Sequence, residues 1–208
     1  PGIDVHAGRL DDADMERELS GACIVVDATH PFATLASGNI RAASLAVGAR
    51  CLRLARPVEA LPKGVVAVAS IACAARFLSE NPGRALLTTG SKELAPYTSV
   101  ADFAERFFVR VLPLPGAITK CIDAGFSPSH VIGMQGPFTR ELNEAMLRQV
   151  GAQWLVTKDS GTVGGTAEKL AAARDVGARC IVVTRPAEGS GALSLREVKD
   201  VLLREFAR

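Results

Sequence analysis

Short apolar runs alternate with alanine-rich or amphipathic stretches along this 208-residue chain. The runs are rich in Val, Ile and Leu, which is typical of strands buried between helices. The pattern predicts strands over 23–26, 51–54, 65–68, 85–88, 107–112, 130–134, 154–157 and 180–184. It predicts helices over 33–47, 70–79, 116–125, 139–150 and 166–176, and a last helix from residue 194.

Capping residues support these helix boundaries. Glycine follows three of the predicted helices, at Gly48, Gly151 and Gly177, where a left-handed residue commonly ends a helix. Ser70 is suited to cap the helix that follows it. Ser194 and Glu197 have the spacing of a capping box, so we expect a helix to begin there.

Regular strand–helix–strand alternation predicts right-handed crossovers and parallel sheets. We therefore expect an α/β protein with two Rossmann-like, doubly wound parallel-sheet domains and a cleft between them. Five βα units follow Gly83, whereas the segment before Asn81 holds fewer strands than a complete sheet. The turn Asn81-Pro82-Gly83 is the predicted boundary, which gives an incomplete N-terminal domain over 1–82 and a C-terminal domain over 83–208.

Composition excludes several classes of protein. The net charge is only +2 and no basic run stands out, which argues against nucleic acid as a partner. No apolar run approaches the roughly 20 residues that span a bilayer. The five cysteines are isolated and show no zinc-site spacing, so we expect no metal and a cytoplasmic location. The oligomeric state is left open.

Polar or glycine-rich segments follow four of the predicted strands. Because parallel strands end at the same edge of a sheet, ligands bind outside those ends. We therefore expect a binding cleft formed by the segments 27–32, 88–92, 135–139 and 157–165.

Two of these segments suggest contacts with a phosphate. Thr29 and His30 are suited to bind a cofactor phosphate or ribose, or His30 to donate a proton, but they are equally suited to cap the strand end. Gly90 allows close approach of a ligand, and Lys92 beside a helix N-terminus would attract an anion. A capped turn with a solvated lysine is the alternative, since the spacing matches neither a Walker loop nor GxGxxG.

The other segments suggest contacts with an acidic or planar ligand. A function is favoured over a scaffold role for Lys158-Asp159-Ser160-Gly161, because glycines beside Lys, Asp and Ser are costly as pure scaffold. Phe138 is placed to stack on a planar ring or to pack under the next helix. Arg53 has the reach to bind a carboxylate, although a solvated arginine is the commoner case. No nucleophile or paired-carboxylate motif appears, which leaves a reaction carried by a cofactor.

The same segments resemble one known family. The sequence is similar to the precorrin-6A reductases of cobalamin biosynthesis from about Gly8 to the last strand. The resemblance rests on Asp27-Ala-Thr-His-Pro-Phe-Ala33 above all. It also rests on Leu52-Arg-Leu-Ala-Arg-Pro57, Thr89-Gly-Ser-Lys92, Gly133-Met-Gln-Gly-Pro-Phe-Thr139, Lys158-Asp-Ser-Gly161 and Arg185-Pro186.

This resemblance implies an activity and assigns residues to it. It implies hydride transfer from NADPH to a double bond of the tetrapyrrole precorrin-6A, giving precorrin-6B, with both molecules in the interdomain cleft. The implied cofactor-binding residues are Thr29, His30, Gly90, Ser91, Lys92, Gly136 and Pro137. The implied substrate-binding residues are Arg53, Phe138, Lys158, Asp159, Ser160 and Gly161. His30 and Lys158 are the candidates for a catalytic group.

Alternatives remain open within and beyond this family. They are a cobalt-precorrin-6A reductase of the anaerobic pathway, a generic NADP-dependent reductase, and a non-catalytic NADP- or tetrapyrrole-binding protein. Family members usually begin with a strand and a Gly-Gly-Thr-type turn well before the equivalent of Gly8. This sequence starts at Pro1 without that turn, so we expect the N-terminal glycine-rich βα unit to be lost or left out.

Overall fold

The computed structural model describes residues 3–6, 8, 10–57, 60–161, 164–187, 189 and 191–207. The chain forms two compact units. Unit 1 combines residues 1–57 with 186–208, and unit 2 is the continuous segment 58–185. No helix in the described part of the chain is long and apolar enough to cross a membrane.

Unit 1 is built on a small parallel sheet. Its elements are α1 (Asp12–Leu19), β1 (Ile24–Asp27), α2 (Thr34–Ala46), β2 (Arg50–Arg53) and α9 (Leu195–Phe206). The pairing of β1 with β2 sets Asp27 opposite Arg53 at the carboxyl edge of the sheet. The segment that returns from unit 2 extends this pairing, because Leu193 forms a parallel bridge with Leu54.

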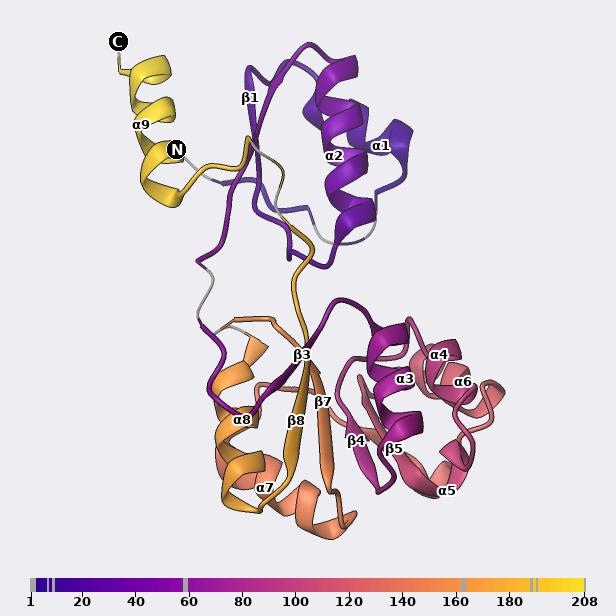
Figure 1. Cartoon of the computed structure of the whole chain (residues 1–208). Helices are drawn as coiled ribbons and strands as arrows, with labels where there is room; N and C mark the ends of the chain where they lie inside the picture. Colours follow the sequence, from indigo (N-terminus) through magenta and orange to yellow (C-terminus); the bar gives the residue numbers. More distant parts are fainter. Residues whose placement is uncertain are drawn as a thin grey trace. The chain divides into compact units, whose positions relative to one another are not determined.

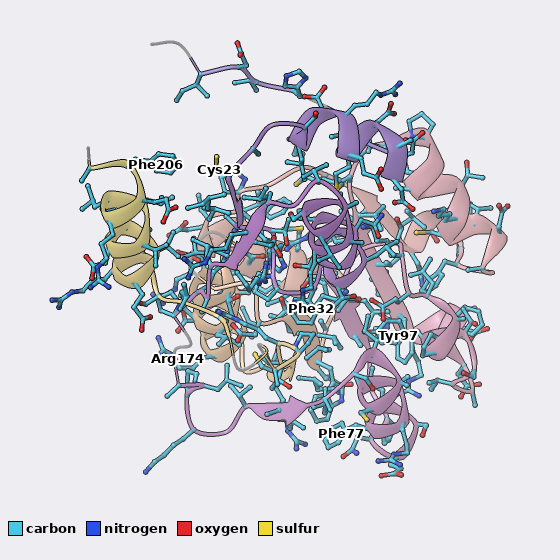
Figure 2. The ribbon with its side chains drawn as sticks, turned by 90° about the horizontal axis from the view of Figure 1, so that it is seen from above. Cys23, Phe32, Phe77, Tyr97, Arg174 and Phe206 are labelled. Atoms are coloured by element: carbon cyan, nitrogen blue, oxygen red, sulfur yellow. The ribbon has the colours of Figure 1, made fainter. Side chains whose placement is uncertain are left out.

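The sequence predicted one of the two terminal helices of unit 1 but not the other. At the start of α9, Ser194 and Glu197 cap each other reciprocally, which confirms the predicted capping box. Phe206 lies near the end of this helix (Figure 2). By contrast, α1 was not predicted. None of its residues is buried, so it lacks the apolar periodicity that would reveal a helix.

Unit 2 is built on a six-stranded parallel sheet in the order β3-β8-β7-β4-β5-β6. The strands are β3 (Val66–Val68), β4 (Ala85–Leu87), β5 (Phe107–Val111), β6 (Val131–Gly133), β7 (Trp154–Lys158) and β8 (Arg179–Val183). The helices are α3 (Ile71–Glu80), α4 (Ala95–Thr98), α5 (Phe103–Arg106), α6 (Pro115–Asp123), the 3₁₀ helix η1 (Pro128–His130), α7 (Arg140–Gln149) and α8 (Thr166–Asp175). Helices α7 and α8 cover one face of the sheet, and α3 to α6 lie on the other (Figure 1).

The strand order of unit 2 reverses direction at one place. The chain runs outward from β4 through β5 to β6, then returns to β7 on the other side of β4. Loops that leave β4 and β7 therefore run to opposite faces of the sheet. Such a switch point opens a crevice at the carboxyl ends of the strands, where ligands of doubly wound proteins bind.

Apolar side chains fill both faces of this sheet. Leu86 and Leu155 on adjacent strands pack with Met146 and Leu147 of α7 and Ala172 of α8. On the other face, Phe77 of α3 (labelled in Figure 2) meets the Trp154 ring edge-on at a centroid distance of 5.2 Å. Several of the buried helix side chains are small, such as Ala74 and Ala75 of α3 and Ala172 and Ala173 of α8.

The predicted α/β class with parallel sheets is confirmed, but the structure divides the chain elsewhere than at residues 82 and 83. Strand β3 pairs with β8, so it completes the sheet of unit 2 although it precedes the Asn81-Pro82-Gly83 turn. The C-terminal helix, which was expected in the second domain, belongs to unit 1. Strand order depends on pairing between distant segments, which a local turn signal does not reveal.

Candidate functional site

In unit 1, the predicted site begins at the end of β1 with a buried carboxylate. The Asp27 side chain is only 3% exposed, yet it accepts hydrogen bonds from the Thr29 backbone N–H at 3.0 Å, the Thr29 hydroxyl at 2.7 Å and the Ser37 hydroxyl. The guanidinium of Arg53 pairs with it, with 3.0 Å between Nη1 and Oδ1. Burial alone would raise the pKa of Asp27, but the hydrogen bonds from Ser37 and Thr29 and the charge of Arg53 hold this pKa below its ordinary value.

This network gives Thr29 and Arg53 defined roles in the folded chain. The Thr29 hydroxyl donates to Asp27 and accepts from Nη1 of Arg53 at 2.9 Å. His30 accepts a hydrogen bond at Nδ1 from the Phe32 backbone, and its ring stacks on the Phe32 ring. Thr29 therefore closes the turn after β1 on Asp27, but it does not cap the following helix, whose N-cap is Ala33. The predicted contacts of Thr29 and His30 with a cofactor, and of Arg53 with a substrate, stay predictions.

A pocket of about 520 Å³ adjoins this network within unit 1. Its described lining comes from the end of β1, the first turns of α2, β2 and the returning segment. Those residues are Asp27, Pro31, Thr34, Ser37, Gly38, Arg41, Cys51, Arg53, Pro186, Ala187, Gly189, Gly191 and Ala192. Arg41 and the beginning of α2 favour an anion here, whereas Arg53 already pairs with the Asp27 carboxylate, which lines the same pocket.

In unit 2, the loop after β4 is less suited to anions than the sequence suggested. The helix that follows Lys92 is α4, which has a single turn and begins at Ala95. A helix this short offers a weak dipole, so it adds little to the attraction of Lys92 for an anion, and that predicted contact stays a prediction. Gly90 has φ of +82° and open space where a side chain would lie, and it lines a pocket.

The loop after β7 is held by internal contacts. Asp159 pairs with Arg185 at 2.8 Å, and both side chains are largely buried. A Cβ added to Gly161 would lie 3.0 Å from Nη2 of Arg185, and one added to Gly164 would collide with Ser160. Lys158 pairs with Glu93 at 3.0 Å. These contacts give Asp159 and Gly161 scaffold roles, and their predicted contacts with a substrate stay predictions.

Four predicted residues come together with others around one pocket at the switch point of unit 2. The pocket has a volume of about 540 Å³, and we name it the Arg110 pocket. Its described lining comes from the carboxyl ends of β4, β5 and β6 and the beginning of α8. Those residues are Thr88, Gly90, Arg110, Val111, Leu112, Met134, Gly136, Pro137, Phe138, Gly164, Gly165 and Lys169.

Phe138 has a defined place in this pocket. Its ring folds back over Gly136, where an added Cβ would lie 2.9 Å from the ring. The guanidinium carbon of Arg110 lies 3.8 Å from the centroid of the same ring, in a cation–π contact. Phe138 also packs against the core beneath α7 and α8. The predicted packing under the following helix is therefore present, and stacking on a planar ligand stays a prediction.

Sequence reasoning missed Arg110 and Lys169. Both line the Arg110 pocket, and they are 5% and 7% exposed. Burial lowers the pKa of Arg110 to about 10. For Arg110 a signal existed, since it is the one charged residue in the strand Phe-Phe-Val-Arg-Val. Lys169 lies on a helix, where lysine is common, and gave no signal.

The chain matches one protein family along most of its length. The family model for precorrin-6x reductase CbiJ/CobK matches residues 1–203. The chain belongs to this family. A solved structure of CobK precorrin-6A reductase is similar with a TM-score of 0.73 and 26% sequence identity, covering 94% of this chain and 80% of that one.

Named relatives in this reductase family come from archaea and bacteria. Cobalt-precorrin-6A reductase of Methanothermobacter thermautotrophicus is 40% identical over 84% of this chain and 59% of its own length. The protein of the same name from Salmonella typhimurium is 36% identical, over 88% of this chain and 71% of its own. Precorrin-6A reductase of Mycobacterium tuberculosis is 30% identical, over 84% and 68%. The chain thus spans well under the full length of these relatives.

Proposed function

We propose that this chain acts in cobalamin biosynthesis as a reductase of the precorrin-6A macrocycle, giving precorrin-6B. The observation that carries the proposal is the match to the reductase family along residues 1–203. The Arg110 pocket at the switch point supports it, because doubly wound proteins bind their ligands there. The proposed location is the cytoplasm, which the five free cysteines favour.

The proposed cofactor is NADPH, which supplies a hydride when bound. Its phosphates need cations and backbone N–H groups, and the unit 1 pocket offers both. Arg41 and Arg53 line this pocket beside Thr34, the first residue of α2. The chemistry of these donors fits an anionic nucleotide. We retain Thr29 and His30 as its neighbours, with Ser91 and Lys92 as further cofactor residues. Gly90, Gly136 and Pro137, which the resemblance also assigned to the cofactor, line the Arg110 pocket of unit 2, and we now propose that they face the substrate.

The proposed substrate is a tetrapyrrole with carboxylates around its rim, and its metal content has two candidates. The relatives named above that are 36% and 40% identical are called cobalt-precorrin-6A reductases, whereas the one at 30% is called a precorrin-6A reductase. These names favour the cobalt-containing substrate. The candidate residues for its carboxylates are Arg53, Lys158, Ser160 and their neighbours.

Reduction of a carbon–carbon double bond needs a proton as well as a hydride. His30 and Lys158 are the proposed donors, and a donor must come within hydrogen-bond reach of the carbon. The Lys158 ammonium carries a proton beside the Glu93 carboxylate. The chain's other part in the reaction is to orient the macrocycle and to exclude water from the reacting carbon.

The direct test is anaerobic incubation of the chain with NADPH and either precorrin-6A or cobalt-precorrin-6A. We expect the macrocycle absorbance to change together with oxidation of NADPH, faster with the cobalt form. Binding of NADPH or macrocycle with no spectral change would instead favour a non-catalytic binding protein. No binding of any of the three would overturn the proposal.

The catalytic candidates are tested separately with His30→Ala and Lys158→Ala. Loss of one proton donor is expected to slow turnover about 100-fold or more while NADPH binding persists. Circular dichroism checks that each variant folds. Unchanged turnover in both variants would rule out these two side chains as donors without touching the overall activity.

A further inference from the structure

Two buried cations share the Arg110 pocket of unit 2. Arg110 lies at the penultimate position of β5, and Lys169 lies on α8. Their side chains converge on one cavity from the sheet and from the helix that covers it. Burying two like charges in one cavity costs several kcal/mol unless a counter-charge is present.

The hydrogen-bond acceptors that the described residues offer to these two cations are uncharged. Nη1 of Arg110 donates to the side-chain oxygen of Asn143 at 2.8 Å, and Nζ of Lys169 donates to the backbone oxygen of Gly164 at 2.7 Å. Both acceptors are neutral. Within the described part of the chain, neither cation forms a salt bridge with a carboxylate.

The two cations also oppose each other. Burial, together with a smaller effect of the Arg110 charge, lowers the pKa of Lys169 to about 8, against a smaller opposite effect of Glu168. An anion in the cavity would raise this pKa again. It would stabilise the charged forms of both cations, in place of the water that they lose on burial.

Donors remain available to such an anion. Among the described residues, only Nη1 of the Arg110 guanidinium has a protein hydrogen-bond acceptor. Among the described residues, no fully buried side-chain nitrogen lacks a partner. The remaining N–H groups of Arg110 therefore reach the open cavity. The Phe138 ring holds the guanidinium plane from one side, 3.8 Å from its carbon, so these donors have a fixed direction.

The rest of the cavity wall is largely apolar. Val111, Leu112, Met134 and Pro137 line it beside Phe138. A free phosphate or a small hydrated ion would gain nothing from this wall. A carboxylate attached to an apolar or ring-shaped body satisfies both parts, with its oxygens on the cations and its body on the apolar side.

We propose that the Arg110 pocket binds a carboxylate carried on an apolar ring, with Arg110 and Lys169 as its two counter-charges. Under the proposed function this group is a side-chain carboxylate on the rim of the tetrapyrrole. The inference rests on that function for the identity of the ligand, but the pocket itself can be tested with simpler carboxylates.

The first experiment measures dissociation constants of uroporphyrin III, a tetrapyrrole with rim carboxylates, and of NADPH, using the full chain. For Lys169→Met we expect the uroporphyrin dissociation constant to rise about 30-fold, as for loss of one buried charge pair, and the NADPH constant to stay within about twofold. Lys120→Met is the matched control, because it removes an exposed lysine of unit 2 outside the pocket. Weakened NADPH binding with unchanged uroporphyrin binding would assign the pocket to a nucleotide phosphate and overturn the proposal.

The second experiment separates the pocket from the proposed function. Benzoate is a carboxylate on an apolar ring, and its binding is followed by carbon-13 NMR of labelled lysine side chains. Saturating benzoate is expected to move the pKa of Lys169 upward from about 8, with Lys169→Met identifying the signal. Arg110→Lys, which keeps the charge but loses the planar fork, should bind benzoate several-fold more weakly.

These outcomes can be told apart. Benzoate binding without any reduction of precorrin-6A would leave the carboxylate pocket standing and defeat the reductase proposal. The opposite result is reduction of precorrin-6A, with no shift of the Lys169 pKa by benzoate and no loss of uroporphyrin binding in Lys169→Met. It would leave the reductase proposal standing and overturn the carboxylate pocket. Should Lys169→Met fail to fold, Arg110→Lys carries the same comparison.

Discussion

At the scale of single residues, the two arginines at the strand ends are handled in opposite ways. Arg53 pairs with the Asp27 carboxylate at 3.0 Å, so its charge is compensated within unit 1. Among the described residues, the contacts of Arg110 are with uncharged groups, namely the side-chain oxygen of Asn143, the sulfur of Met146 and the face of Phe138. A buried arginine that pairs with a carboxylate is stabilised within the fold. A buried arginine without a carboxylate partner lowers the stability of the fold, and an anionic ligand can remove that penalty.

The Asp27 network predicts a stability that depends on pH. The pKa of Asp27 in the folded chain lies below its ordinary value of 3.8, so the ionised network stabilises the fold above that pH. Asp27→Asn should lower the free energy of unfolding by about 2–4 kcal/mol at pH 7. As the pH falls through the lowered pKa, the wild-type protein loses this contribution, and the gap between the two proteins should narrow.

Urea unfolding of both proteins between pH 7 and pH 3 measures this gap. Asp200→Asn, an exposed change on α9, is the control and should have little effect at any pH. A gap that stays constant down to pH 3 would contradict the proposed role of the ionised carboxylate.

Lys169 makes the opposite prediction. A lowered pKa means that the fold favours the charged form of Asp27, whereas for Lys169 it means that the fold disfavours the charged form. In the unfolded chain this pKa is near 10.5, whereas burial and Arg110 bring it to about 8 in the folded chain. Below pH 8 the folded chain therefore carries the full penalty of the buried charge, and stability should rise as the pH increases from 8 to 10.5. Lys169→Met should stabilise the ligand-free chain by about 1–2 kcal/mol at pH 7, after allowance for the lost bond to Gly164.

The measurement is urea unfolding of wild type and Lys169→Met at pH 7 and pH 10. The stabilisation should be smaller at pH 10, where the wild-type lysine is largely neutral. A variant that is less stable than wild type at both pH values would show that the Lys169 ammonium stabilises the ligand-free fold. That result would contradict the prediction that its burial is unfavourable without a ligand.

At the scale of the elements, the sequence predicted most strands and helices but not how they assemble. Periodicity and caps are local, so Ser194 and Glu197 revealed the start of α9. The pairing of β3 with β8 joins segments far apart in the chain and had no local signal. The candidate site shows the same limit. The strand-end loops gave Gly136 and Phe138, while Lys169 reaches the pocket from within a regular helix.

The loop between β7 and α8 illustrates why its glycines were hard to interpret. Gly164 lies in the segment 157–165 that was expected to line the cleft. A Cβ at this position would lie 1.9 Å from that of Ser160, so the close approach of the chain to itself requires glycine. We expect Gly164→Ala to lower the free energy of unfolding by about 2–4 kcal/mol, because the backbone must shift to relieve the overlap.

Thermal unfolding followed by circular dichroism tests this change. Gly116→Ala is the control, since Gly116 lies in α6 with nothing within 4 Å of an added Cβ. That substitution should be neutral or stabilise by up to about 1 kcal/mol. Equal stability of Gly164→Ala and Gly116→Ala would show that the loop adjusts freely.

At the scale of the whole molecule, the chain passes between its two units at two Arg-Pro pairs. It leaves unit 1 after Arg56-Pro57, and it returns after Arg185 with Pro186. Proline cannot donate to a strand ladder, so it ends pairing where the chain changes unit. Unit 1 is consequently made from two distant segments, whereas unit 2 is one continuous segment that contains the complete six-stranded sheet.

This division predicts that residues 58–185 fold without the rest of the chain. Their sheet, the helices on both faces and the described lining of the Arg110 pocket all belong to unit 2. We expect the fragment to unfold cooperatively in urea with a free energy of about 5 kcal/mol or more. It should also bind benzoate as tightly as the full chain does, within about twofold.

Residues 1–82, which end within the sheet of unit 2, should show no cooperative transition, because α3 and β3 would lack the strands against which they pack. A fragment 58–185 that unfolds gradually would mean that unit 2 depends on contacts with unit 1. A folded fragment that fails to bind benzoate, when the full chain binds it, would mean that the carboxylate site needs groups from outside unit 2.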